Sequence, residues 1–177
     1  AYDSTTVKYV GVKGCQACHM SRRKGAQYRV WKNGPHAKAY ATLATPEALA
    51  YGAERGIDTP QESPECLRCH VTGYGLPDAR HGRKWKITDG VSCESCHGAG
   101  EAYAPRRVMC EITAGIREAS SVGLIDKPNE QVCVQCHNPD SPGYKEFVYS
   151  ERLERIAHRQ PESLAEETKA KGCEGSR

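Results

Sequence analysis

The chain has 177 residues and a formal net charge of +3, and this length fits a single domain. Leu, Ile, Val and Phe together account for only 25 residues, and the mean hydropathy is −0.69, which is below the level typical of a packed polypeptide core. Lys and Arg are scattered apart from two short runs at 22–24 and 106–107, which argues against a nucleic-acid-binding surface. No apolar run approaches 18 residues, so no transmembrane helix is expected.

Helical patterns begin after residue 26. Residues 27–43 favour helix, with a break where the sequence reads Asn-Gly-Pro at 33–35. Proline suits the first turn of a helix, so His36 is expected at the start of a new helix, where its backbone is held rigidly. Thr45 is a candidate N-cap for another helix, which opens at 46–50.

The second half of the chain has fewer regular patterns. Residues 83–88 alternate weakly, which favours a short hairpin arm, and Asn129 is a candidate N-cap for a helix entering residue 133. Further helices are expected at 106–120, 144–159 and 162–171. The predicted fold class is therefore mainly α, with long irregular connections. Such connections are unusual in a compact domain unless something else fills the interior.

One pentapeptide pattern, Cys-x-x-Cys-His, occurs four times, at 15–19, 66–70, 93–97 and 133–137; these are the first to fourth motifs. The spacing is the attachment signal for c-type haem, in which both thiols bond to the porphyrin and the histidine becomes an axial iron ligand. The predicted attachment residues are Cys15, Cys18, Cys66, Cys69, Cys93, Cys96, Cys133 and Cys136. The predicted proximal ligands are His19, His70, His97 and His137.

Other interpretations of a Cys-x-x-Cys pair are a redox dithiol, half of a zinc site, or a disulfide framework. None of them requires histidine directly after the second cysteine in all four copies. We therefore expect four covalent haems in a single tetrahaem domain spanning residues 1–177. Four apolar porphyrins would supply the missing core, so the protein without haem is expected to stay unfolded.

Covalent haem attachment takes place outside the cytoplasm, so an exported protein, extracellular or periplasmic, is expected. No signal peptide is seen, and the chain is expected to be the mature form beginning at Ala1. Two cysteines lie outside the motifs, Cys110 and Cys173. An oxidising compartment permits a disulfide between them, and the alternatives are free thiols or bridges to a neighbouring molecule.

Counting histidines exposes a shortage. Of the seven, four belong to the motifs, and His36, His81 and His158 remain as distal ligands for four irons. The missing ligand is Met20, Met109, Tyr103 or a histidine of another molecule, or one iron is five-coordinate with an open face. The sequence does not decide which haem lacks a ligand.

Three segments resemble the tetrahaem cytochrome c-554 family. They are the Trp-Lys-Asn-Gly-Pro-His-Ala-Lys-Ala stretch at 31–39, the second motif with its continuation at 66–75, and the third motif with its flanks at 90–100. The third is the most specific, and the resemblance spans roughly residues 8–160. It implies a multihaem electron carrier.

The resemblance also implies a ligand scheme. His36 would ligate the haem of the third motif and His158 that of the fourth. The family usually has a histidine for the first haem shortly after the third motif, but here residues 101–107 contain none. In this family the second haem can be five-coordinate. His81 lies beyond the family pattern, and it would fill one of these two gaps.

The function expected from the motifs is electron transfer through four closely packed haems, with redox proteins or extracellular acceptors as partners and without enzymatic activity. Some extracellular cytochromes resembling the family polymerise into filaments, in which a histidine of one subunit ligates a haem of the next. A homo-oligomer or filament with His81 as donor is one expectation. The alternatives are a discrete periplasmic shuttle that accepts electrons from a multihaem oxidoreductase, and an enzyme reducing a small nitrogen species at an open haem.

Overall fold

A computed structural model describes residues 2–141 and 144–173. Within these ranges about half of the residues are helical, and a single parallel bridge between Tyr9 and His81 is the nearest approach to a strand. The α-helices are α1 (Val12–His19), α2 (Gln27–Asn33), α3 (Ala39–Thr42), α4 (Pro46–Ala53), α5 (Pro64–His70), α6 (Cys93–His97), α7 (Arg106–Thr113), α8 (Glu130–Cys133), α9 (Tyr149–Ile156) and α10 (Ser163–Lys171). The mainly α prediction is confirmed.

Short 3-10 turns fill several of the connections. They are η1 (Arg22–Lys24), η2 (His36–Lys38), η3 (Asp78–Arg80), η4 (Ile87–Asp89), η5 (Gly100–Ala102) and η6 (Ala119–Val122). No helix of the described ranges combines the length and the apolar character that crossing a bilayer requires.

The helix breaks follow local chemistry. As predicted, α2 ends at Asn33 and a new turn begins at His36 after Pro35. The hydroxyl of Thr45 accepts a hydrogen bond from Ala48 N at 3.3 Å, so Thr45 caps α4 as expected. The helices expected at 106–120 and 144–159 are shorter than predicted, because α7 ends at Thr113 and α9 covers only Tyr149–Ile156.

The hairpin arm expected at 83–88 is wrong, because this stretch forms a turn and then η4. The Trp85 side chain is responsible for the difference. Its ring stacks on His81 with centroids 3.9 Å apart, and its Nε1 donates to Thr72 O at 2.8 Å. These contacts draw the stretch inward against the segment after α5, so that it has no partner strand.

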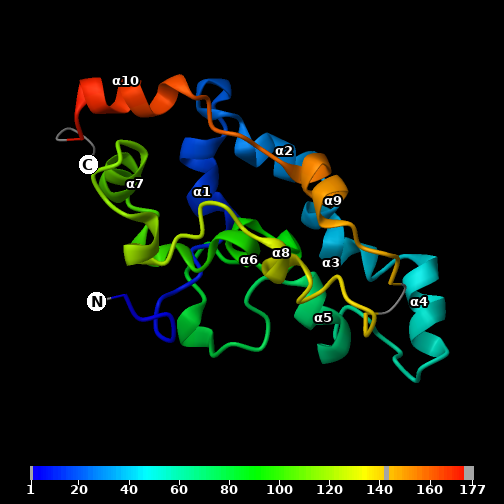
Figure 1. Cartoon of the computed structure of the whole chain (residues 1–177). Helices are drawn as coiled ribbons and strands as arrows, with labels where there is room; N and C mark the ends of the chain where they lie inside the picture. The colour runs from blue at the N-terminus through cyan, green and yellow to red at the C-terminus, as the bar shows by residue number, and fades with distance from the viewer. Residues whose placement is uncertain (1, 142–143, 174–177) are drawn as a thin grey trace.

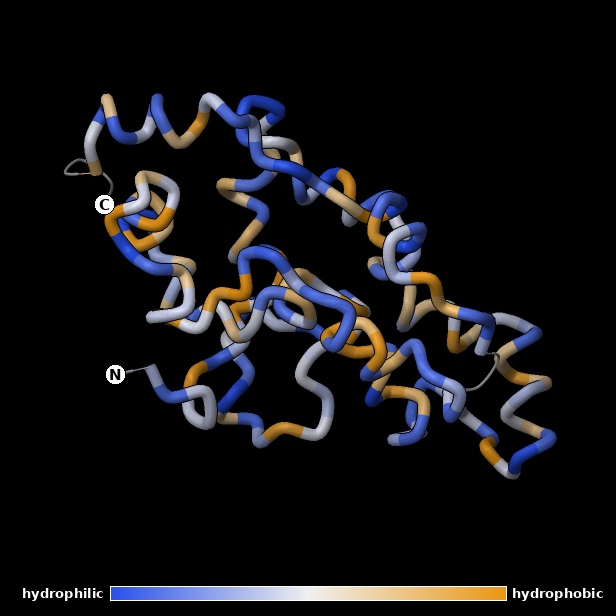
Figure 2. Tube along the Cα trace, viewed as in Figure 1, coloured by the Kyte–Doolittle hydropathy of each residue, from blue (hydrophilic) through white to orange (hydrophobic). Residues whose placement is uncertain are grey.

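The polypeptide core is small. Leu43, Leu67 and Val71 are buried together, and partly buried aromatic and aliphatic side chains surround them. Figure 2 shows hydrophobic segments that are short and alternate with hydrophilic ones along most of the trace. The chain therefore has little apolar surface of its own to bury, in line with its composition.

Figure 1 places α6 and α8 near the middle of the molecule, with α1 and α5 on different sides of them. Helix α6 contacts both α1 and α8, and α2 contacts α1. The segment after α9 runs back beside the start of α2, where the Arg159 carbonyl lies against Gly25. This return of the chain decides which histidines meet.

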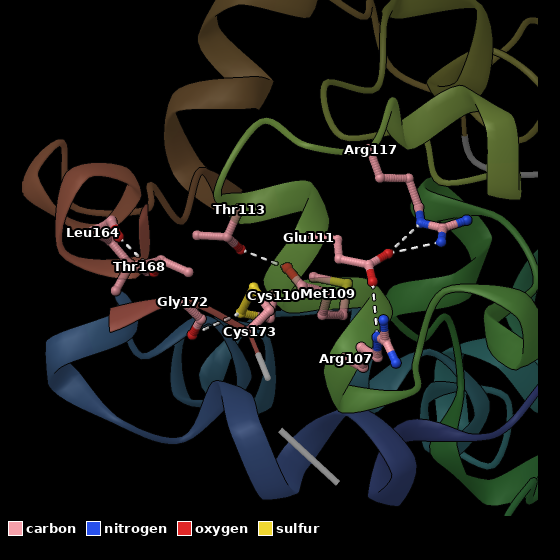
Figure 3. Close-up of a disulfide and its surroundings, with 10 residues drawn as sticks. All are labelled: Arg107, Met109, Cys110, Glu111, Thr113, Arg117, Leu164, Thr168, Gly172 and Cys173. Carbon is pink, nitrogen blue, oxygen red and sulfur yellow. Dashed lines mark hydrogen bonds and ion pairs between the residues drawn. A yellow bond between two sulfur atoms is a disulfide. The ribbon is translucent and has the colours of Figure 1, made fainter. Parts of the chain in front are cut away.

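The C-terminal helix packs on α7, away from the middle of the molecule. Cys110 of α7 and Cys173, just beyond α10, form a disulfide with a Cα–Cα distance of 5.7 Å (Figure 3). Arg23 of η1 forms an ion pair with Glu167 on α10. One covalent bond and one exposed ion pair thus hold the last described helix in place.

Candidate functional site

Each Cys-x-x-Cys-His motif forms a helical turn. The first three motifs lie at the ends of α1 and α5 and along the whole of α6, and the fourth begins at the end of α8. In the fourth motif the turn continues through a bond from His137 N to Cys133 O of 3.0 Å. Residues three apart on a helix share a face, so each pair of thiols points to one side. All eight motif cysteines are free of disulfides.

Three of the motif histidines are oriented by their Nδ1 atoms. Nδ1 of His70 donates to Ala39 O at 2.6 Å, and Nδ1 of His97 donates to Ile125 O at 2.6 Å. Nδ1 of His19 lies 3.3 Å from Gln27 Oε1. A metal-binding histidine generally uses one ring nitrogen for such a bond, and this leaves the other for the metal. Nε2 is therefore the free nitrogen in these three rings.

The fourth motif histidine is held differently. The His137 ring stacks on Phe147, with centroids 4.9 Å apart and an angle of 13° between the ring planes. Burial lowers the pKa of His137, and it also lowers the pKa values of His19, His36 and His97. Neutral imidazole is the form that binds a metal, so burial favours the ligating form.

Two non-motif histidines face motif histidines. The ring centroids of His36 and His137 are 6.0 Å apart, and those of His97 and His158 are 5.9 Å apart. Two imidazoles on opposite sides of one metal ion have centroids roughly 6 Å apart, since each nitrogen lies about 2 Å from the metal. Nδ1 of His158 donates to Ile156 O at 2.9 Å, so its Nε2 is free. Both pairs fit one iron between two rings.

The pairing differs from the scheme that the resemblance implied. It assigned His36 to the third motif and His158 to the fourth, whereas the nearest histidine rings are His36 with His137 and His158 with His97; His36 also lines the cavity beside the third motif. The reason is the path of the chain beyond α9, which runs back past Gly25 toward α1. His158 therefore lies at the N-terminal end of α2, while His36 lies beyond its C-terminal end.

A cavity of about 70 Å³ adjoins the third motif. Apolar and motif side chains line most of it, among them Trp31, Val91, Cys93, Cys96, His97 and His158. A porphyrin is larger than this cavity, so the edges of a bound haem would extend beyond it. The lining suits the face of an apolar ring, and the thiols and the two imidazoles occupy the positions that covalent haem requires.

His81 is placed apart from these pairs. Its ring stacks on Trp85, its Nε2 donates to Gly73 O at 2.9 Å, and its side chain is only 15% exposed. Among the described residues, neither His19 nor His70 has a second histidine ring at the distance seen in the other two motifs. The first and second motifs are therefore the two whose histidines have no paired histidine ring in the described part of the chain.

Two of the other candidate ligands are engaged elsewhere. The Tyr103 hydroxyl donates to Gly98 O at 2.5 Å, and burial raises the pKa of this phenol, which keeps it neutral. The Met20 sulfur lies 3.3 Å from Gln16 Nε2, and its side chain is exposed. Met109 lies on α7, next to Cys110 of the disulfide.

The motifs form a row whose order differs from the order in the sequence. The Cys15 and Cys93 thiols are neighbours, and their interaction raises the pKa of Cys15 and lowers that of Cys93. Burial, together with the nearby Cys133 thiol, raises the pKa of Cys96 to about 11. Burial and the neighbouring Cys69 thiol raise the pKa of Cys136 to about 12. These thiol neighbours, together with the contacts of α6 with α1 and α8, give the order first, third, fourth, second, and Thr72 also joins the second motif to the third.

Residues 36–39 connect three of the motifs. The His36 ring faces the fourth motif, and His36 O accepts a bond of 3.1 Å from Val91 N, just before the third. Ala39 O accepts the Nδ1 bond of His70 in the second motif. Gly90 has φ +67°, and a Cβ there would lie 2.8 Å from His36 O, so glycine is needed for this close approach.

Two further residues at the site were not singled out in the sequence. The Thr72 hydroxyl accepts a bond of 2.6 Å from Ser92 N and lies 2.6 Å from Ser95 Oγ, which joins the end of α5 to α6. Glu94 is 2% exposed, although it occupies a variable position of the third motif. A threonine after a motif and a charge inside one give no signal in a single sequence.

The motif turns, the free thiols and the oriented imidazoles together define a covalent haem site of the c-type cytochrome class. The family model described as "Cytochrome c554 and c-prime" matches residues 14–98, which include the first three motifs. Cytochrome c-554 of Nitrosomonas europaea is 31% identical over 99 residues, which cover 54% of this chain and 40% of that protein. The resemblance to the cytochrome c-554 family is thereby confirmed, and it implies covalently bound haem c.

The chain thus covers less than half of the length of this curated relative. No solved structure matches the chain.

Proposed function

We propose that this chain is a tetrahaem c-type cytochrome that transfers electrons along a row of four haems. The observation that carries the proposal is the row of neighbouring motifs, with Cys15 beside Cys93, Cys96 near Cys133, and Cys136 near Cys69. Haems attached at neighbouring motifs lie close together, and closeness is what electron exchange between them requires. The haem supplies the redox chemistry, and the chain fixes ligation, burial and orientation.

The two types of motif support a division of roles. His158 and His36 would be the second ligands of the irons at the third and fourth motifs, so these haems would only relay electrons. The first and second motifs stand at the two ends of the row. An electron would enter at one end and leave at the other.

The experiment is a haem count on the purified holoprotein. Intact mass and the pyridine haemochrome spectrum should both give four haems per chain. Stepwise reduction should be reversible over a range of potentials. A count below four, or haem released by acid extraction, would overturn the tetrahaem proposal.

We further propose that the protein is exported and that it assembles into filaments through the haems at the first and second motifs. Within the described chain these two motifs have no second histidine ring, so a histidine of a neighbouring subunit could be the missing ligand. The Cys110–Cys173 disulfide suits an oxidising compartment. If His81 is the donor to a neighbouring subunit, its ring must leave Trp85 and give up the bond to Gly73.

Electron microscopy of the native protein separates the assembly states. Filaments with a continuous row of haems would support the polymeric conductor. Single particles would favour a shuttle, which is the alternative suggested by the match to a cytochrome c-554. A high-spin ferric signal that shifts on adding nitric oxide, together with catalytic reduction of nitric oxide, would instead favour a reductase acting on a small nitrogen species.

A further inference from the structure

The buried carboxylate of Glu94 joins the first and third motifs. Its Oε1 accepts hydrogen bonds from Val10 N at 2.8 Å and from Gly100 N at 2.7 Å, and its Oε2 accepts one from Gly11 N at 2.8 Å. Val10 and Gly11 lead directly into α1, which carries Cys15 and Cys18. A side chain within one motif therefore holds the segment that positions another.

The contacts of Glu94 fit the ionised carboxylate. All three partners are N–H donors, and a protonated carboxyl would place its own hydrogen against one of them. Burial raises the pKa of Glu94, and the three N–H groups act in the opposite direction. No Lys or Arg of the described chain forms an ion pair with it, so backbone amides alone stabilise the negative charge.

The surrounding backbone makes this arrangement rigid. Lys8 N donates to Glu101 Oε2 at 2.9 Å, and Glu101 N donates to Lys8 O at 3.1 Å, so the same two segments are joined a second time. Gly11 has φ +81°, and a Cβ there would lie 2.4 Å from Lys84 O. The segment that binds the carboxylate therefore has little freedom to move.

The charge of Glu94 lies close to the attachment thiols of two motifs. Glu94 directly follows Cys93, and its carboxylate binds the amides of Val10 and Gly11, which lead into the helix of Cys15. The fourth motif begins on a different helix, α8. A fixed negative charge in a poorly screened interior disfavours the addition of an electron nearby.

We propose that Glu94 is a positioning residue that fixes the first motif against the third and whose fixed charge lowers the reduction potentials of the two haems attached there. The proposal rests on the proposed tetrahaem function. Its consequence is a gradient along the row. The first and third haems would have lower reduction potentials than they would with a neutral residue at position 94. Electrons would therefore move from these haems toward the second motif.

The test is Glu94→Gln in the full holoprotein, with potentials measured by spectroelectrochemical titration. The reduction potentials of the haems at the first and third motifs should rise. The expected size of the rise is an equilibrium constant for reduction that is about tenfold larger at each of these haems. Glu101→Gln is the matched control, because Glu101 is exposed and the glutamine amide oxygen can still accept the bond from Lys8 N. The control should leave all four potentials unchanged.

Glu94→Asp is the second variant, and it retains a carboxyl group. The shorter side chain does not reach all three N–H groups, so this buried carboxyl is ionised to a smaller extent, and the same two potentials should rise by less than in the Gln variant. Four unchanged potentials in either variant, or an equal rise of all four, would overturn the proposal. If Glu94→Gln yields no holoprotein, the Asp variant decides by the same criterion. A haem count other than four in the wild-type protein would refute the proposed tetrahaem function, and this result can be distinguished from a failure of the Glu94 proposal alone.

Discussion

The two inner motifs of the row differ from the two outer ones. At the third and fourth motifs a second histidine ring lies about 6 Å from the motif histidine, as two ligands of one iron require. At the first and second motifs the described chain supplies no such ring. The motifs themselves are alike in sequence, so the role of each haem depends on the few histidines outside them and on where the fold carries them.

Removing an inner motif should have the largest effect. Cys93→Ala with Cys96→Ala should abolish most folded holoprotein, because α6 contacts both α1 and α8 and stands between the first and fourth motifs. Haem content and far-UV circular dichroism measure the loss. Cys66→Ala with Cys69→Ala is the control at the end of the row and should retain three haems. Equal yields of the two variants would contradict the central position of α6.

Removing a distal ligand should have a smaller, local effect. His36→Ala and His158→Ala should each convert one low-spin ferric haem to high spin, and the altered haem should be that of the fourth and of the third motif, respectively. Electron paramagnetic resonance counts the spin states. A structure of either variant locates the altered haem, and the reverse assignment would restore the scheme implied by family resemblance.

His81→Ala serves as the comparison for these two variants. Within a monomer it should leave every spin state unchanged, because the His81 ring is held by Trp85 and Gly73. In assembled filaments a new high-spin signal from the same variant would identify His81 as the ligand to a neighbour.

Breaking the link between motifs should reduce stability and leave ligation intact. Thr72→Val removes the hydroxyl bonded to Ser92 N and Ser95 Oγ, and we expect a loss of about 1–3 kcal/mol in the free energy of unfolding. Denaturant unfolding of the holoprotein measures it. Thr88→Val is the control, because Thr88 is exposed, and its effect should stay within about 0.5 kcal/mol. Equal losses in both variants would rule out a special role for Thr72.

The sequence predicted well those features that depend on neighbouring residues. Thr45 predicted the N-cap of α4, and the Asn-Gly-Pro stretch at 33–35 predicted the break before His36. Contacts between distant residues were out of reach. The Nδ1 bond of His97 goes to Ile125, 28 residues away, and that of His70 goes to Ala39, 31 residues away.

Two features that the sequence did not show have the same origin. The histidine rings pair differently from the scheme that the resemblance implied, because no local pattern shows which end of α2 the returning chain passes, and this chain path brings Arg159 against Gly25. Glu94 was missed because a charged residue ordinarily lies on the surface, and its burial depends on three amides supplied by segments elsewhere in the fold. Both features depend on chain path and not on local sequence.

The smallest effect on the haems should come from the C-terminal disulfide, which lies outside the row. Cys110→Ser with Cys173→Ser should leave haem count, spin states and potentials unchanged. The stability loss should stay below the loop-closure value of about 4 kcal/mol for a bridge spanning 63 residues, since thioether bonds in the same segment already restrict the unfolded chain. Faster proteolysis near α10 should be the main change. Arg23→Gln, which breaks only an exposed ion pair, should not reproduce it. A shift in any haem potential would show instead that the C-terminal helix is coupled to the row.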